Sequence, residues 1–268
     1  MRAILLLLAL AVPVSVIAEE GVRLDTAPID LRDVASLQSG ARTFVNYCLN
    51  CHSASSMRYI KLEEIGLSEQ QIKDNLLFTA DKIGELMNVA LTKREAKEWL
   101  NAVPPDLSVI ARARGADWLY TYLRSFYRDA ESATGWNNMV YERVAMPHVL
   151  WTLSGQQVQV ERKFKNEEQA EASARQLKNA WKIDALTPEQ AGKDGERYIL
   201  KTIRTETPGS LSQLEYDLLV RDLVNFMTWM SEPNQLERKQ YGYLVLLALF
   251  ALATLAFYLY KEFWKDVH

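Results

Sequence analysis

Five consecutive residues near position 50 combine two thiols with an imidazole. They are Cys48-Leu49-Asn50-Cys51-His52, a C-x-x-C-H run, which is the pattern to which a c-type haem is attached. The two thiols add across the haem vinyl groups and become thioethers, and the two-residue gap lets one helical turn reach both vinyls. His52 then lies under the ring and offers its imidazole to the iron. We therefore predict one covalently attached haem c, with Cys48, Cys51 and His52 as binding residues and His52 as an iron ligand.

Three other uses of a C-x-x-C pair fit the sequence less well. A thioredoxin-like redox pair needs a strand–helix setting, whereas the flanks here suggest helix and loop. A structural zinc site needs about four ligands, and the chain has 2 Cys and 3 His, of which one is the terminal His268. A disulfide across two residues would be strained. With both cysteines used for haem, no thiol is left to mispair in an oxidising compartment.

The overall composition excludes some classes of partner. The chain has 268 residues, a formal net charge of -3 and a pI near 5.8, whereas a nucleic-acid-binding protein needs a basic face. We therefore expect no nucleic-acid partner. The length allows one large domain or two small ones, and the apolar residues are concentrated at the two ends.

The N-terminus has the pattern of a signal peptide at residues 1–18. Met1-Arg2 supplies the positive charge, residues 3–11 are apolar, and Val16-Ile17-Ala18 fits a small-residue cleavage site. The apolar run is short and Pro13 interrupts it, which argues against a membrane span. We therefore expect residues 19–235 to form an exported haem domain.

The C-terminus predicts a transmembrane helix at residues 241–260. This stretch has no charged residue and is about as long as a bilayer requires. Tyrosines and a tryptophan occur at its two ends, as at membrane interfaces. The flanking positive charges are nearly balanced, so the predicted signal peptide decides the orientation, which places residues 261–268 in the cytoplasm and the anchor in membrane lipid.

The exported body is predicted to be mainly α-helical with irregular loops. We expect Ser39 to cap a helix that carries the haem motif at its end. A capping box at Ser212 and Glu215 predicts a further helix, which ends before Pro233. No run of alternating strands is evident in the body. Further helical segments are expected at 62–77, 83–100, 108–128 and 158–181, and loops at 129–150 and 185–209.

The second axial ligand of the iron is left open by the pattern of residues alone. Electron-transfer haems usually take two protein ligands. Met57 is too close to the haem motif to reach the opposite face of the ring. Met139, Met146 and His148 all lie in the long loop at 129–150 and remain as candidates. Pro147 restricts Met146 to an extended backbone.

Several motifs in order resemble the cytochrome c1 family, in its bacterial form. C-x-x-C-H alone occurs in all c-type cytochromes, but the order of the other motifs is specific. They are Asp33-x-x-x-Leu37-Gln38-x-Gly40, Cys48-x-x-Cys51-His52-Ser53, Pro104-Pro105-Asp106-Leu107-Ser108, Arg112-Ala113-Arg114, Ala145-Met146-Pro147, Asp222-Leu223-Val224-Asn225-Phe226-x-x-Trp229 and Glu232-Pro233, followed by the single C-terminal span.

This resemblance implies a cytochrome c-like haem domain and a role for particular residues. His52 and Met146 would be the axial ligands, Arg114 would pair with a haem propionate, and Pro105 would pack near the haem rim. Residues 142–144 lack a Pro-Gly that many relatives carry there. The stretch 160–205 has no pattern that we can match to the family.

The resemblance also implies a function and a location. The protein would be the electron-transfer haem subunit of ubiquinol–cytochrome c oxidoreductase, in the bacterial inner membrane with its haem domain in the periplasm. It would take electrons from the Rieske iron–sulfur protein, pass them to a soluble or tethered c-type cytochrome, and pack against cytochrome b. It would perform no substrate chemistry of its own.

Two alternatives remain open at this point. The chain could be a membrane-anchored c-type cytochrome that donates to a terminal oxidase or another reductase, which would not account for the Pro-Pro-Asp-Leu-Ser run. It could also be a tethered interaction or assembly protein whose two cysteines form a thiol pair.

Overall fold

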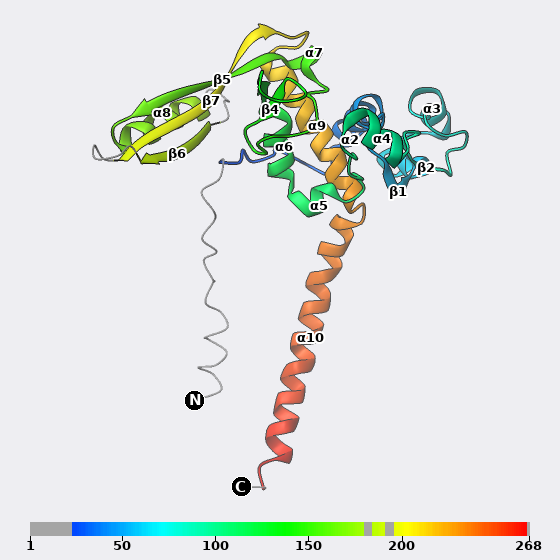
Figure 1. The fold of residues 1–268 in the computed structure, drawn as a ribbon. Coiled ribbons are helices and arrows are strands. Elements are labelled where there is room, and N and C mark those ends of the chain that lie inside the picture. Colours follow the sequence, from blue (N-terminus) through cyan, green and yellow to red (C-terminus); the bar gives the residue numbers. More distant parts are fainter. Residues whose placement is uncertain (1–22, 180–183, 191–195, 267–268) are drawn as a thin grey trace. The chain divides into compact units, whose positions relative to one another are not determined.

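The computed structural model describes residues 23–179, 184–190 and 196–266 (Figure 1). The signal peptide predicted at residues 1–18 lies outside the described residues. The chain divides into two compact units. The larger unit consists of residues 24–158 and the part of the chain after residue 204, and the smaller unit contains Arg23 and the described residues between 159 and 204.

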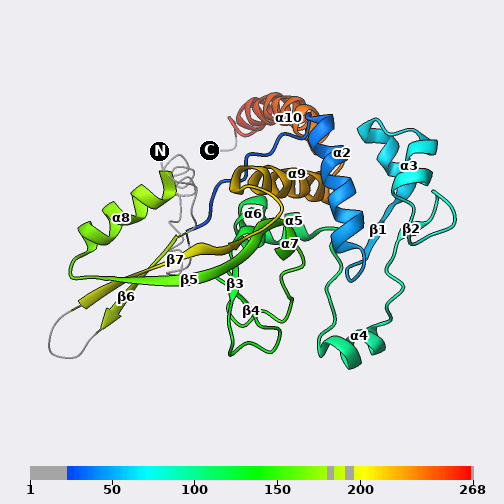
Figure 2. The same ribbon diagram turned by 90° about the horizontal axis from the view of Figure 1, so that it is seen from above.

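The larger unit is mainly helical, as predicted (Figures 1 and 2). Two short antiparallel pairs, β1 with β2 and β3 with β4, supply its small sheets. A π-helical turn at Phe44–Cys48 follows the first helix, and a 3-10 helix at Tyr59–Ile65 follows β1. The elements are α2 (Val34–Thr43), β1 (Ala54–Arg58), α3 (Glu69–Asn75), β2 (Leu86–Met87), α4 (Lys93–Leu100), α5 (Ile110–Arg114), α6 (Ala116–Arg124), β3 (Phe126–Arg128), β4 (Trp136–Asn138), α7 (Trp151–Ser154), α9 (Gln213–Ser231) and α10 (Gln235–Phe263).

The helix α9 is the support against which α2, α5 and α6 pack. Its capping box is confirmed: the backbone N–H of Ser212 donates to the Glu215 carboxylate (2.8 Å), and the Ser212 hydroxyl accepts from the Glu215 N–H. The helix ends at Ser231, shortly before Pro233, which also agrees with the sequence prediction. The buried face of α9 therefore holds three separate segments of the larger unit in place.

The helix α2 crosses α9 at very short range, and Gly40 makes this possible. A methyl group built on Gly40 would lie 2.0 Å from the Asp222 carbonyl oxygen and 2.6 Å from Phe226 Cβ. The crossing is completed by a hydrogen bond of 2.7 Å from the Ser36 hydroxyl to the Asp222 carboxylate and by the rings of Phe44 and Phe226, whose centroids are 5.6 Å apart. Only glycine fits between the two helices at this point.

Some predicted boundaries of the helices were wrong. The helix before the haem motif begins at Val34 rather than after Ser39, because the Asp33 carboxylate accepts from the Ser36 N–H (3.0 Å) and forms the cap. The segments expected to be helical at 62–77 and 83–100 contain shorter elements: the end of the 3-10 helix and α3 in the first, and β2 and α4 in the second.

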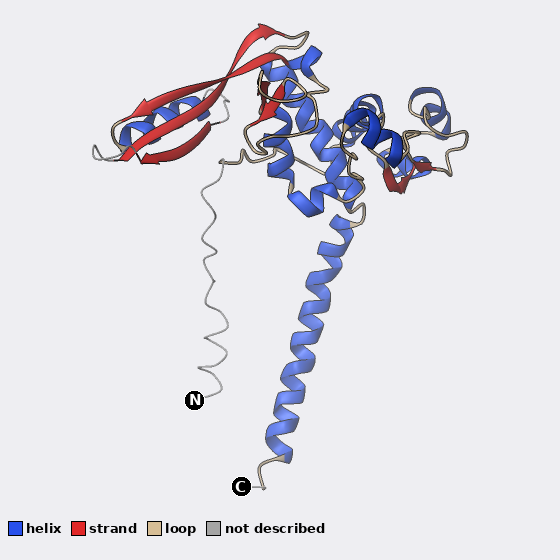
Figure 3. Cartoon of the chain, in the orientation of Figure 1, coloured by secondary structure: helices blue, strands red, loops and turns tan. Residues whose placement is uncertain are grey.

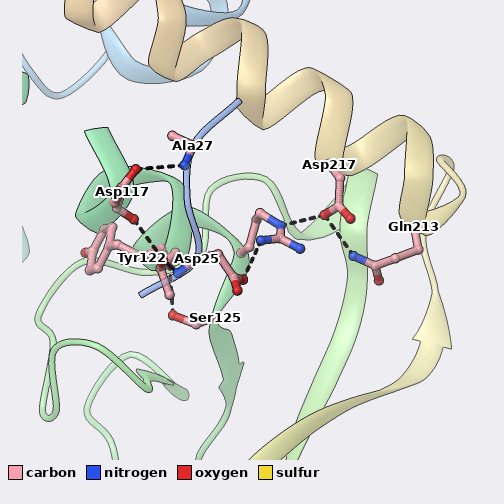
Figure 4. A network of polar contacts seen from close by, with 9 residues as sticks. Asp25, Ala27, Asp117, Tyr122, Ser125, Gln213 and Asp217 are labelled. Atoms are coloured by element: carbon pink, nitrogen blue, oxygen red, sulfur yellow. Dashed lines mark hydrogen bonds and ion pairs between the residues drawn. The ribbon is translucent and has the colours of Figure 1, made fainter. Parts of the chain in front are cut away.

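The N-terminal part of the larger unit is tied to α6 by a polar network (Figure 4). The N–H of Ala27 donates to the Asp117 carboxylate (2.7 Å). Arg124, which is only 3% exposed, pairs with Asp25 (2.8 Å) and with Asp217 of α9 (2.6 Å). Burial alone would lower the pKa of Arg124, but the hydrogen bond and charge of Asp217 outweigh this and raise it, so the guanidinium stays charged.

Most of a three-stranded sheet that the sequence did not predict lies in the smaller unit (Figure 3). The strands lie in the order β5-β7-β6, and β6 pairs with β7 in antiparallel register. The helix α8 contacts β6, and the side chains of Arg23 and Glu171 form an ion pair. The elements are β5 (Gly155–Phe164), α8 (Glu167–Asn179), β6 (Asp184–Gln190) and β7 (Glu196–Pro208).

Two predictions are corrected by this sheet. The helix expected at 158–181 begins only at Glu167, where the Asn166 side chain accepts from the Gln169 N–H (3.0 Å). The loop expected at 185–209 consists largely of two strands. Pro188 is compatible with a strand at this place, because proline is tolerated on an edge strand and β6 is an edge strand of this sheet.

The helix α10 contains the predicted span at residues 241–260. Among the residues that the structure describes, it is the one helix long and apolar enough to cross a membrane. None of its side chains is buried against the rest of the chain, which distinguishes it from a core helix. The helix is therefore suited to anchor the chain in a bilayer.

The crossing of α2 and α9 yields a prediction about Gly40. Gly40→Ala should destabilise the protein by about 3 kcal/mol, because the added methyl group meets backbone and cannot be relieved by a side-chain rotation. For a chain of this size the melting temperature should fall by roughly 6–12 °C, as measured by thermal unfolding of the detergent-solubilised protein. Gly84→Ala is the control, since nothing lies within 4 Å of the added methyl group there. Equal melting temperatures for the two variants would contradict the proposed tight crossing.

Candidate functional site

The two thiols and the imidazole lie on a turn that continues from α2. The π-helical turn closes with a hydrogen bond from the Leu49 N–H to the Phe44 carbonyl (3.0 Å), and the N–H groups of Cys51 and His52 both donate to the Cys48 carbonyl (3.1 and 2.9 Å). Phe44 and Leu49 are fully buried, whereas both cysteines are partly exposed free thiols. The core thus holds the turn through Phe44 and Leu49, while Cys48 and Cys51 are only partly buried.

The imidazole of His52 is held in one orientation by the backbone of Pro105. The Nδ1 atom lies 2.7 Å from the Pro105 carbonyl oxygen. Because a carbonyl oxygen only accepts, Nδ1 must carry the proton, which leaves the lone pair of Nε2 for a metal. Burial lowers the pKa of His52 and outweighs the opposing effects of Pro105 and Asp106, so the imidazole stays neutral, as a metal ligand must be.

The Pro-Pro-Asp-Leu-Ser run positions the Pro105 carbonyl through contacts with the strand after the haem motif. The N–H of Leu107 donates to the Ser53 carbonyl (2.8 Å). The Asp106 carboxylate accepts from the N–H groups of Ser55 and Ser108, both at 2.8 Å. Burial acts to raise the pKa of Asp106, but hydrogen bonds from Ser108 and Ser55 outweigh it and lower the pKa. The hydrogen bonds made by Asp106 and Leu107 therefore account for the residue types in this run, because they hold the Pro105 carbonyl oxygen next to His52 Nδ1.

The three candidates for the second ligand have different environments. Met139 belongs to the hydrophobic core, with 6% of its surface exposed. His148 is also buried, with Nε2 2.8 Å from the Ser154 hydroxyl and its ring stacked on that of Phe126. Met146 is only partly buried, and its sulfur accepts a hydrogen bond of 3.5 Å from the Tyr122 hydroxyl. Of the three, Met146 is the group that the core does not enclose.

The exposed guanidinium of Arg114, at the end of α5, lies beside the aromatic side chain of Trp118 on α6. Its Cζ atom lies 5.2 Å from the centre of the Trp118 ring, which stacks on Tyr122 at 4.8 Å. Within the described part of the chain, no carboxylate forms an ion pair with Arg114. The sequence did not identify Trp118 and Tyr122 as site residues, although Tyr122 follows Trp118 by four residues, a spacing that brings two side chains together on one helix.

The donor set of this region fits a covalently attached haem. It offers two free thiols one turn apart, a neutral imidazole with an available Nε2, and a partly exposed thioether. In the described ranges, no group of three or more His, Cys, Asp or Glu side chains is placed to hold a metal ion.

The chain is similar in sequence to one protein family and to several characterised proteins. The model of the "Cytochrome C1 family" matches residues 26–177 and 206–267. The chain is 43% identical, over 99% of its length and 97% of the relative, to the "Ammonia monooxygenase gamma subunit" of Nitrosomonas europaea. It is 41% identical, over its whole length and 99% of the relative, to "Cytochrome c1" of Allochromatium vinosum. It is 27% identical to "Cytochrome c1" of Rhodospirillum rubrum, over 88% of this chain and 83% of that one.

The burial of His148 predicts a specific pH dependence of stability. Burial lowers the pKa of His148 to about 3, whereas an unfolded histidine titrates near 6.5. Below about pH 6.5 the unfolded chain gains a proton that the folded chain does not bind, so stability should fall by up to about 1.4 kcal/mol per pH unit. Above pH 6.5 this contribution to stability should be complete.

The test compares melting temperatures of the wild-type protein and the His148→Gln variant between pH 4 and pH 8. The difference between the two proteins should be largest at pH 8 and should shrink as the pH falls, because glutamine does not titrate. Curves that stay parallel over the whole range would show that His148 does not cause the effect.

Proposed function

The chain belongs to the cytochrome c1 family, and on this premise we propose that it takes single electrons from a Rieske iron–sulfur protein and passes them to a c-type cytochrome. Members of the family carry a covalently attached c-type haem and are electron-transfer subunits of the cytochrome bc1 complex. The observation that carries the proposal is the contact between His52 Nδ1 and the Pro105 carbonyl (2.7 Å). This contact keeps the proton on Nδ1, so Nε2 of His52, the histidine that directly follows Cys51, has a lone pair available for a metal.

We assign the residues of the site as follows. Cys48 and Cys51 hold the haem through thioethers, and His52 Nε2 and the Met146 sulfur bind its iron. Arg114 neutralises a propionate, because a guanidinium fork matches a carboxylate. Pro105 fixes the orientation of His52 and thereby the direction of its lone pair. When bound, the haem supplies one-electron chemistry, and the residues set its potential.

The proposed location follows from the same reasoning. We propose that α10, the one helix of the described residues that is long and apolar enough to cross a membrane, anchors the chain with a single pass. We propose that the haem domain, 19–235, lies in the periplasm and that residues 261–268 lie in the cytoplasm, since the N-terminal eighteen residues have the pattern of a cleaved signal peptide. Cytochrome b is then the partner that packs against α10 in the membrane.

A second candidate function deserves a test because of one similarity. The chain is also closely similar to a protein named as a subunit of ammonia monooxygenase. A membrane-anchored c-type cytochrome that serves another redox enzyme would have the same haem site and anchor. The two functions differ in the proteins with which the chain forms a complex.

The proposed function is tested by purification in mild detergent. The chain should be recovered with a b-type cytochrome and an iron–sulfur protein, and quinol should reduce its haem in that complex. Removal of the iron–sulfur protein should abolish the reduction, and its return should restore it. Recovery of the chain alone or with oxygenase subunits, or rapid quinol reduction of the isolated chain, would favour the second candidate.

The assignment of Met146 predicts a change in spectrum and potential. Met146→Leu keeps the volume but removes the sulfur, so the far-red sulfur-to-iron absorption of the ferric form should disappear. The midpoint potential should fall, because thioether ligation favours ferrous iron. Met139→Leu is the matched control and should keep the absorption. If the absorption survives in Met146→Leu and is lost in Met139→Leu, the ligand is Met139.

The assignment of Arg114 predicts a smaller change in the same direction. Arg114→Gln removes a positive charge near the haem, which should lower the midpoint potential, because that charge favours the reduced state. Arg112→Gln removes the same charge two residues earlier and serves as the control. A fall in potential only in the Arg112 variant would transfer the propionate to Arg112.

A further inference from the structure

The hydroxyl of Tyr122 lies 3.5 Å from the sulfur of Met146 and donates a hydrogen bond to it. A thioether sulfur has two lone pairs. If one lone pair binds iron, the other can accept from a phenol, so the contact is compatible with ligation. A contact that survives ligation acts directly on the donor atom of the ligand.

The ring of Tyr122 is fixed by its neighbours on both sides. Trp118 stacks on it with a centroid distance of 4.8 Å and an interplanar angle of 11°. Phe126 meets it edge-on at 5.0 Å. These three aromatic residues are spaced by four and form one column, so the hydroxyl of Tyr122 cannot swing freely away from Met146.

The loop that carries Met146 is held to the same column at a second point. The ring of His148 stacks on Phe126 with a centroid distance of 4.8 Å and an interplanar angle of 5°. The edge of the imidazole is held by the Ser154 hydroxyl, 2.8 Å from Nε2. The two contacts, from Met146 to Tyr122 and from His148 to Phe126, set the register of the loop on the column.

We propose that Tyr122 is a positioning residue that raises the haem potential through its hydrogen bond to the Met146 sulfur. The bond draws electron density from the sulfur, which then donates less to the iron and stabilises the ferric state less. The positive end of the O–H dipole acts in the same sense. The inference depends on the proposed function, in which Met146 is the axial ligand.

The test uses Tyr122→Phe in the full-length haem protein. Phenylalanine keeps the ring between Trp118 and Phe126 and removes only the hydroxyl. The midpoint potential should fall, and the far-red absorption of the ferric form should remain but shift. Free imidazole should displace Met146 from ferric iron less readily than in wild type, because a sulfur without the hydrogen bond is a stronger donor.

Tyr120→Phe is the matched control. It makes the same chemical change on the same helix, at a buried tyrosine whose ring lies 4.4 Å from the Arg124 guanidinium carbon. Its potential, spectrum and imidazole affinity should equal those of wild type. A change of equal size in both variants would indicate a general effect of the helix and overturn the proposal.

The Met146→Leu variant separates this inference from the function on which it rests. Retention of the far-red absorption in Met146→Leu removes Met146 as the ligand and overturns the inference about Tyr122, whereas the electron-transfer function would stand with another residue as the ligand. If that absorption is lost but Tyr122→Phe has the potential of wild type, only the inference about Tyr122 fails. An increase in imidazole affinity in Tyr122→Phe would show that the hydroxyl restrains the loop mechanically, which also contradicts electronic tuning.

Discussion

Both halves of the haem site depend on how closely other helices approach α9. On one side α2, which leads into the thiols and His52, touches α9 at Gly40. On the other side α6, which carries Tyr122, is joined to α9 by the pair Arg124–Asp217 (2.6 Å) and by the Tyr216 hydroxyl, which donates to the Leu123 carbonyl (2.8 Å). A buried ion pair contributes little net stability, since desolvation offsets the attraction. Its contribution here is positional, because a buried guanidinium between two carboxylates permits one placement of α6.

In the loop at 104–108, several individually weak hydrogen bonds together fix the orientation of the His52 imidazole. A single hydrogen bond contributes only about 1 kcal/mol to stability, and those made by Asp106 are near the surface. Together they fix where the Pro105 carbonyl points. That carbonyl selects the tautomer of His52, and the tautomer leaves a lone pair on Nε2, the atom that binds iron in the proposed function. These hydrogen bonds contribute little to the free energy of unfolding, but they determine the orientation and the tautomer of His52.

Some features that depend on residues close together in the sequence were predicted correctly. Features that depend on contacts between distant residues were not predicted. The haem motif, the capping box at Ser212 and the apolar helix at the C-terminus are local patterns, and the last two are present in the structure. The sheet of the smaller unit was missed because a strand that contains a proline, as β6 contains Pro188, is possible only at the edge of a sheet, and that position depends on residues far away in the sequence. The contact of Tyr122 with Met146 joins residues that no local rule relates. Only the packing of α6 against the loop brings them together.

Two glycines of the larger unit, Gly155 and Gly209, flank the segment that contains the sheet of the smaller unit. A methyl group on Gly155, whose φ is +84°, would lie 2.2 Å from the Thr207 carbonyl oxygen, and one on Gly209 would lie 2.2 Å from the Leu153 carbonyl oxygen. The two strands therefore begin and end in direct backbone contact. The family model leaves residues 178–205 unmatched, and every residue assigned to the haem lies in the larger unit. The residues proposed to hold the haem therefore lie outside the segment that the family model leaves unmatched.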